Sequence, residues 1–336
     1  MRQAKFFGYM FILIGLTYFT PHRVFSQETN NFRQKKKVLS DIFNTYDSTF
    51  IKKTDAKFVV GIKNHNWLDA YKLNSDNMDI NFKSDLYYDL GLFTGYKFLQ
   101  VAYYVNMNNL LSGEKAKRKG LNLDLVSNIV SLECFYLKNE GETTITDYGP
   151  NDINKVLDIP FYGLQSKILG ADFYYYFNNK RYSNSAAYAD GHYYWQNKNA
   201  GSFIAGISFS NNNISYDFSE FKNDEDLSAL SEIGPIKNNY YTYCVSVGYG
   251  YNFVFSKNWL ANLTVIPSLG TKVKKDDNSH KKYFTTRNKS KIAVIYSLPK
   301  YFFGINCQYN INWDNSGDYV SANSMGTFNL LLGVRL

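Results

Sequence analysis

The chain alternates apolar and polar residues over most of its length, and residues 239–255 show this most clearly. Aromatic or β-branched residues occupy every second position of this stretch, and mostly small or polar residues lie between them. A period of two places the two sets on opposite faces of an extended strand. A soluble strand of this length needs a large partner sheet to cover its aromatic face, whereas a bilayer covers it directly. The pattern therefore predicts a membrane-spanning strand.

Similar segments recur from residue 57 to the C-terminus and predict fourteen strands. We place them at 57–63, 78–96, 99–107, 121–127, 129–137, 167–177, 182–189, 200–210, 214–218, 239–255, 258–273, 290–298, 301–313 and 324–336. Residues 78–96 count as one strand because their apolar positions stay in phase through Ser84. An even number of strands suits a single-chain bacterial barrel with both ends in the periplasm. Twelve and sixteen strands are the alternatives.

The connections between these segments alternate in length. Short ones fall at 97–98, 128, 178–181, 211–213, 256–257 and 299–300, and long ones at 64–77, 108–120, 138–166, 190–199, 219–238, 274–289 and 314–323. Barrels of bacterial outer membranes combine short periplasmic turns with longer extracellular loops. The sequence therefore predicts an all-β fold, a transmembrane antiparallel up-and-down β-barrel.

The N-terminus has the pattern of an export signal. Arg2 and Lys5 precede an apolar stretch at residues 6–19, and a small residue, Ser26, stands before Gln27. We predict a signal peptide at 1–26, cleaved near Ser26/Gln27, and a location in the outer membrane of a Gram-negative bacterium. An uncleaved membrane anchor is the alternative. Residues 27–56 form a periplasmic arm or a small plug, and the barrel occupies 57–336.

Composition agrees with this interpretation. The chain has 30 Tyr and 26 Phe but only 6 Pro, as aromatic-rich strands require. Its formal charge of +8 falls to +5 once the three basic residues of the signal peptide are removed. Three widely spaced cysteines, Cys134, Cys244 and Cys307, indicate neither a disulfide framework nor a zinc site. Nucleic acid is not expected as a partner of an exported barrel.

Residues 172–210 read DFYYYFNNKRYSNSAAYADGHYYWQNKNAGSFIAGISFS. The stretch resembles the family of domain of unknown function 4421. The matching features are the tyrosine-rich strand before Asn178, Tyr182-Ser183, Ser185-Ala186-Ala187, Gln196 and Ala200-Gly201-Ser202. Residues 91–97 and 247–249 are similar as well, and the resemblance covers about residues 55–336. It implies an exported outer-membrane barrel without an assigned activity.

Candidate catalytic groups are few, and we expect no enzyme, cofactor or metal site. His65, His192 and His280 all fall in predicted extracellular loops. His192 lies near Asp190, Ser183 and Ser185, and His65 lies close to Asp69, but such pairs arise by chance in polar loops. The acidic run Asp224-Glu225-Asp226 lacks the spacing of a calcium loop.

Two predicted loops carry opposite charge. The basic one holds Lys274, Lys275, Lys281, Lys282, Arg287 and Lys289, and the acidic one holds Glu220, Asp224, Glu225, Asp226 and Glu232. They could fold together over the barrel mouth, the basic loop could bind lipopolysaccharide phosphates, or each could be solvated alone. Expected partners are outer-membrane lipid, lipopolysaccharide and, during assembly, the barrel-insertion machinery.

The inward positions of the strands are polar and uncharged, with interspersed glycines. The predicted pore-lining residues are Thr242, Ser246, Asn252, Asn262, Thr264, Asn306, Gln308 and Asn310. We therefore expect a passive channel or uptake barrel for a small neutral or amphipathic solute. A structural or interaction barrel that binds lipopolysaccharide or a surface partner is the alternative, and a lipid-modifying enzyme is the least expected. The lumen could be open or packed shut.

Overall fold

The computed structural model describes residues 45–75, 78–96, 99–107, 118–149, 155–188, 193–223, 228–232, 234–275, 282–315 and 320–336. Residues Tyr46–Leu336 form one compact unit, distinct from Met1–Thr45. The predicted signal peptide and the first part of the predicted arm, residues 27–44, lie outside the described residues.

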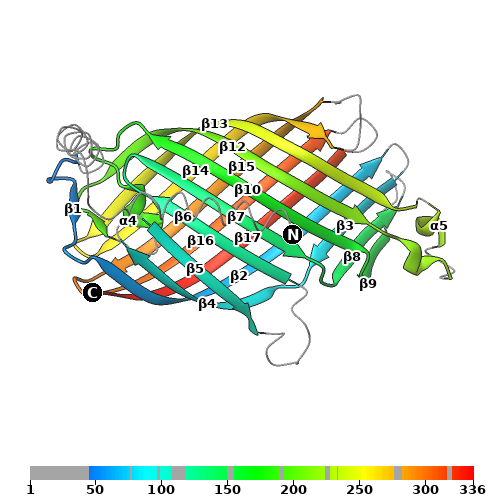
Figure 1. Cartoon of the computed structure of the whole chain (residues 1–336), viewed down its shortest axis with the longest axis horizontal. Coiled ribbons are helices and arrows are strands. Elements are labelled where there is room, and N and C mark those ends of the chain that lie inside the picture. The colour runs from blue at the N-terminus through cyan, green and yellow to red at the C-terminus, as the bar shows by residue number, and fades with distance from the viewer. Residues whose placement is uncertain are drawn as a thin grey trace, which may run out of the picture. The chain divides into compact units, whose positions relative to one another are not determined.

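Twelve strands close into a barrel (Figure 1). They are β2 (Phe58–Ser75), β4 (Tyr87–Tyr96), β5 (Leu99–Asn106), β6 (Arg118–Val126), β7 (Val130–Asn139), β10 (Leu164–Tyr176), β12 (Ala200–Tyr216), β13 (Ile236–Ser256), β14 (Trp259–Lys274), β15 (Lys282–Ser297), β16 (Tyr301–Asn315) and β17 (Val320–Arg335). Each pairs antiparallel with its neighbour along the chain, and β17 pairs with β2 to close the cylinder. The predicted closed, antiparallel up-and-down barrel is confirmed.

Further elements lie at the two ends of the barrel (Figure 1). β3 (Met78–Ser84) pairs with the last part of β2, and β8 (Thr143–Gly149) and β9 (Lys155–Phe161) extend the sheet from β3. The short helices η1 (Ser219–Phe221) and α5 (Ser228–Ser231), in the connection between β12 and β13, pack against them. At the opposite end, β1 (Ile51–Lys53) pairs with β11 (Tyr194–Gln196), close to helix α4 (Asn184–Tyr188). We refer to these as the β8 end and the α4 end.

The barrel has twelve strands, one of the two alternatives to the predicted fourteen. Residues 182–189 were expected to form a strand but contain α4, and the predicted strands 200–210 and 214–218 are parts of β12. The asparagines at 211–213 do not form a turn, because their amides find partners along the wall. Asn212 Nδ2 donates to Thr242 Oγ1 at 2.9 Å, and Lys275 Nζ donates to Asn213 Oδ1 at 2.6 Å.

Two other boundaries also differ from the prediction. The predicted loop 64–77 belongs largely to β2, which runs to Ser75, and the predicted strand 78–96 divides into β3 and β4. Both of these strands pair with β2, so their shared apolar phase reflects a common partner. Because residues 182–189 contain α4 instead of a strand, the connection between β10 and β12 runs from 177 to 199. It is long although it lies at the α4 end, where the other connections are short. The predicted alternation of short and long connections fails there.

The barrel has an apolar outer face and a mostly polar inner face. In β13, Val247 is 67% exposed, whereas its neighbour Ser246 is 3% exposed. Phe203, Leu263, Phe284 and Leu332 repeat this outward exposure on other strands. The face assignment predicted from the period of two in residues 239–255 is therefore confirmed.

An aromatic core fills the β8 end. Phe82 of β3 packs on Phe161 of β9 with ring centroids 5.4 Å apart, and Phe161 stacks on Phe218 at 5.2 Å. Leu230 of α5 and Ile236 of β13 complete the same buried cluster. The packing joins the β3–β8–β9 extension to the connection between β12 and β13.

Candidate functional site

The long connection between β10 and β12 folds inside the α4 end of the barrel. We call its described residues, 177–188 and 193–199, the plug. Their apolar side chains contact the wall on several sides. Tyr182 packs with Ile204 and Ile266, Ala186 and Ala187 pack with Leu260, Ala293 and Ile295, and Tyr193 packs with Phe93, Phe302 and Leu331. These wall residues come from β4, β12, β14, β15, β16 and β17, so the plug reaches across the barrel.

Gln196 is the central polar residue of the plug. Its side-chain nitrogen donates to the carbonyls of Arg181 at 2.6 Å, Lys198 at 2.8 Å and Phe50 at 3.3 Å. Its side-chain oxygen accepts from the backbone N–H of Ser183 and from Asn252 Nδ2, each at 2.9 Å. Gln196 therefore connects the plug to itself, to the barrel wall and to the N-terminal segment.

Three of the predicted pore-lining residues hold the plug. Asn252 Nδ2 donates to Gln196 Oε1 and also to the carbonyl of Ser183 at 2.9 Å. Asn262 Nδ2 donates to the Tyr182 hydroxyl at 3.1 Å. Thr264 donates to Asn262 Oδ1 at 2.8 Å. Burial raises the pKa of Tyr182. Gly250 on the wall leaves room for the Tyr182 hydroxyl, because a Cβ at this position would collide with it.

Residues 46–56 clamp the plug from the N-terminal side. Thr54 N–H donates to the carbonyl of Tyr193 at 2.8 Å, and Asn197 N–H donates to that of Phe50 at 2.7 Å. Hydrogen bonds from Thr49 lower the pKa of the Asp47 carboxyl. This part of the predicted arm therefore holds the plug from outside the plug's own segment.

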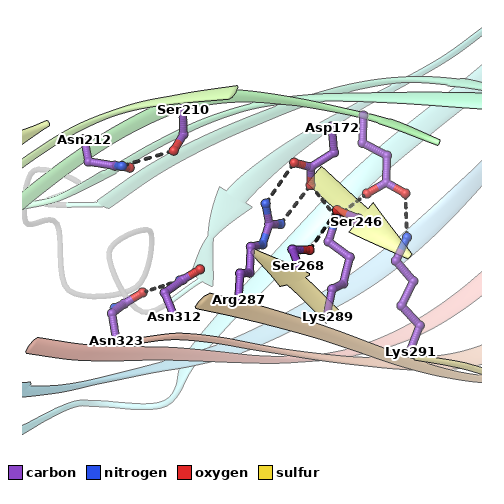
Figure 2. Close-up of polar contacts among 11 residues, drawn as sticks. Asp172, Ser210, Asn212, Ser246, Ser268, Arg287, Lys289, Lys291, Asn312 and Asn323 are labelled. Atoms are coloured by element: carbon purple, nitrogen blue, oxygen red, sulfur yellow. Dashed lines mark hydrogen bonds and ion pairs between the residues drawn. The ribbon is translucent and has the colours of Figure 1, made fainter. Parts of the chain in front are cut away.

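A cavity of about 250 Å³ lies in the lumen above the plug. Asn184 and Tyr188 of α4 line it, together with residues of the barrel wall. Of the remaining predicted pore-lining residues, Thr242, Asn306, Gln308 and Asn310 face this cavity. Ser246 instead bonds to Ser268 at 2.7 Å on the neighbouring strand (Figure 2).

A network of ion pairs crosses the lumen beside the cavity (Figure 2). Arg287 of β15 makes a bidentate pair with Asp172 of β10, with N–O distances of 2.9 and 2.8 Å. Lys289 donates to Asp172 at 2.5 Å and to Glu133 of β7 at 2.9 Å, and Lys291 donates to Glu133 at 2.5 Å. Three strands separate β15 from β10, so these pairs tie together distant parts of the wall.

The expectation of an uncharged inner face is therefore wrong. Arg287 and Lys289 were expected in an extracellular loop, but they lie within β15 and point inward. The outward residues Asn288 and Ser290 are polar, so the sequence shows no alternation of apolar and polar positions in this part of β15. The inward cations could still have been found from their spacing. Arg287, Lys289 and Lys291 stand at every second position in phase with the buried Ala293 and Ile295.

The histidine and serine candidates do not come together in the described part of the chain. His65 faces the lumen from β2, where Nδ1 contacts Asn329 Oδ1. Ser183 donates to Asn128 Oδ1 at 2.5 Å, and Ser185 is buried in α4. His192, His280, Asp190 and the acidic run 224–226 lie outside the described residues. Within the described ranges, no three His, Cys, Asp or Glu side chains converge in a way that could bind a metal ion, and no helix has the length and apolar character needed to span a bilayer.

The fold and its lumen define this protein as a closed β-barrel that contains a folded plug. The family model of domain of unknown function DUF4421 matches residues 45–336, so the chain belongs to this family. This confirms the membership predicted from residues 172–210. Several of the residues that carry that resemblance, Tyr182-Ser183, Ser185-Ala186-Ala187 and Gln196, are plug residues.

Solved structures of outer-membrane barrels resemble the chain at low identity. The outer membrane protease OmpT from Escherichia coli is 9% identical, with a TM-score of 0.34, over 85% of this chain and 98% of that chain. The CymD monoaromatic hydrocarbon channel is 10% identical, with a TM-score of 0.28, over 84% and 89% of the two chains. The β domain of the Bordetella autotransporter BrkA is 10% identical, with a TM-score of 0.27, over 84% and 99%. A search of curated proteins finds no match.

Proposed function

We propose that the barrel spans the bacterial outer membrane. The observation that supports this is the exposed apolar outer face on a closed barrel, since only helices and closed barrels satisfy their backbone groups in lipid. Strands β12 to β17 have 15 to 21 residues, more than the 9 to 11 or so needed to cross the hydrocarbon core. The α4 end, with mostly short connections, would face the periplasm and the β8 end the exterior.

The proposed activity is gated uptake of a small polar solute. The lumen cavity supports solute binding, and the plug that reaches across the α4 end supports gating rather than free diffusion. Polar contacts made by Asn252, Asn262 and Gln196 hold the plug, and such contacts can be exchanged for water when it moves. The proposal differs from the passive channel expected from the sequence in one respect, that the channel opens when the plug is displaced.

An interaction barrel is the second candidate. Its support is the folded β8 end, where the β3–β8–β9 extension and the aromatic core build a stable platform. In that case the partners would be lipopolysaccharide or a surface protein, and no solute would pass. The same experiment separates the two functions.

Proteoliposome swelling in isotonic solutions of small sugars tests gating. Ala187 is fully buried against β14 and β15, so Ala187→Trp overfills the contact between plug and wall. We expect slow swelling with the wild type and several-fold faster swelling with Ala187→Trp. The matched control is Ala261→Trp on the outer face of β14, which should behave like the wild type. Equally tight vesicles with a folded Ala187→Trp barrel would favour the interaction function.

A further inference from the structure

A row of polar residues crosses the outer face of the barrel near the β8 end, on the adjacent strands β6, β7, β10, β12 and β13 (Figure 1). Lys138 of β7 is the direct strand partner of both Lys119 of β6 and Lys167 of β10. The register then passes through asparagines of β12 and β13 to Lys275, just after the end of β14. We call these residues the lysine row: Lys119, Lys138, Lys167, Asn213, Asn239 and Lys275.

The lysine row marks the boundary of the apolar outer face toward the β8 end. Two residues toward the α4 end, the corresponding positions of β6 and β7 are Leu121 and Tyr136. The Lys167 Nζ lies 6.0 Å from the centroid of the Tyr136 ring, and the Lys275 Nζ lies 5.0 Å from that of the Tyr241 ring. Lysines at such a boundary pack their stems on apolar surface and hold their amines at the level of lipid headgroups.

Carboxylates do not balance the lysines on this face. Within the described bounds of β6, β7, β10, β12, β13 and β14, none of the outward positions is Asp or Glu. Asp217 and Glu220 lie beyond the end of β12 and accept backbone hydrogen bonds there. Glu140, one residue beyond β7, pairs with Lys138 at 2.6 Å. This pair is exposed and therefore weak, so Lys138 keeps N–H donors for another anion.

The strand register brings like charges together. Lys167 directly faces Lys138, and among the described residues it has no carboxylate partner. Like charges directly opposite each other on a sheet repel, so this arrangement favours an anion between the two amines. At the other end of the row, Lys275 Nζ donates to Asn213 Oδ1 at 2.6 Å and to the Asn212 carbonyl at 3.2 Å. These amide oxygens fix the position of the amine without neutralising its charge.

We infer that the lysine row binds the phosphate groups of lipopolysaccharide. A phosphate would accept charge-assisted hydrogen bonds from Lys138 and Lys167, whose strands are about 4.8 Å apart. The acyl chains of the same lipid would lie on the apolar face next to the row, over Leu121 and Tyr136. The inference rests on the proposed location in the outer membrane with the β8 end outside, because lipopolysaccharide occupies the outer leaflet. The site differs from the basic loop expected from the sequence, which contributes Lys275.

Native mass spectrometry of the full chain in detergent micelles tests the binding. The probes are bisphosphorylated lipid A, the same lipid A with its phosphates removed, and phosphatidylglycerol. We expect lipid A to bind at least about tenfold more tightly than either of the others, since one phosphodiester reaches fewer lysines than the phosphates of lipid A. Equal affinity for the two forms of lipid A would overturn the inference. Equal affinity for phosphatidylglycerol would overturn the choice of lipopolysaccharide.

A pair of double variants identifies the site. Lys138→Gln/Lys167→Gln removes the two facing cations and should weaken lipid A binding at least about tenfold. The matched control is Lys257→Gln/Lys300→Gln, which makes the same change of charge in exposed turns at the α4 end and should leave the affinity unchanged. If the first double variant does not fold, Lys167→Gln alone decides, with an expected loss of about threefold. Unchanged affinity in a folded variant of the row, or equal losses in the row and control variants, would overturn the assignment.

The lipid site and the proposed location can fail separately. A chain that fractionates with the outer membrane but binds both forms of lipid A equally would keep the location and lose the site. Selective binding of phosphorylated lipid A by a chain that does not fractionate with the outer membrane would support the phosphate site and remove the location.

Discussion

Gln196→Ala should open the plug, because the side chain connects the plug to two other parts of the protein. Of its five hydrogen bonds, the one from Asn252 Nδ2 reaches the barrel wall and the one to the Phe50 carbonyl reaches the N-terminal clamp. The other three, with Arg181, Ser183 and Lys198, stay within the plug. Only the first two should change the equilibrium between a seated and a displaced plug.

The size of the effect follows from those two bonds. Each contributes on the order of 1 kcal/mol net, so seating loses about 2 kcal/mol. At about 1.4 kcal/mol per factor of ten, the population of the displaced plug rises roughly thirtyfold. Loss of the three bonds within the plug makes the plug itself less ordered. It does not strongly favour the seated or the displaced position.

Single-channel recording in planar bilayers measures this population as open probability. The wild type should be closed most of the time, and Gln196→Ala should raise the open probability by about thirtyfold at unchanged single-channel conductance. Gln165→Ala, at an exposed position near the start of β10, is the matched control. The reasoning is refuted if Gln196→Ala remains a folded barrel and its open probability stays within threefold of the wild type.

Two further changes test other parts of the structure. Arg287→Gln removes the bidentate partner of the fully buried Asp172, which keeps its ion pair with Lys289. The change should cost about 1.5–3 kcal/mol of unfolding free energy, measured by denaturant titration in micelles, and adding Asp172→Asn should recover part of the loss. Val247→Arg on the outer face should lower the unfolding free energy in a bilayer by about 2–4 kcal/mol. The control Ser219→Arg, in the connection at the β8 end, should change it little. Equal losses in the two variants would argue against a lipid-facing β13.

The sequence by itself determined the class of fold and the faces of its strands. The strict alternation in residues 239–255 has one solution, an extended strand with an apolar and a polar face, because side-chain direction is a local property of the backbone. Lysines and arginines in β15 could have been assigned in the same way, since their phase with Ala293 and Ile295 is visible in the sequence. Polar residues on the outer face of that strand were enough to make it look like a loop.

Only the tertiary structure decided the strand count, the plug and the lumen network. Residues 182–189 have apolar and small side chains that suit a strand as well as a short helix, and they become α4 because the barrel wall supplies Leu260, Ala293 and Ile295 to bury them. The asparagines at 211–213 continue β12 because Thr242 of the neighbouring strand β13 and Lys275, just after the end of β14, satisfy their amides. Asp172 and Arg287 are 115 residues apart and meet only because the cylinder closes. Such contacts depend on which strands face each other across the lumen, and local sequence patterns carry no record of that arrangement.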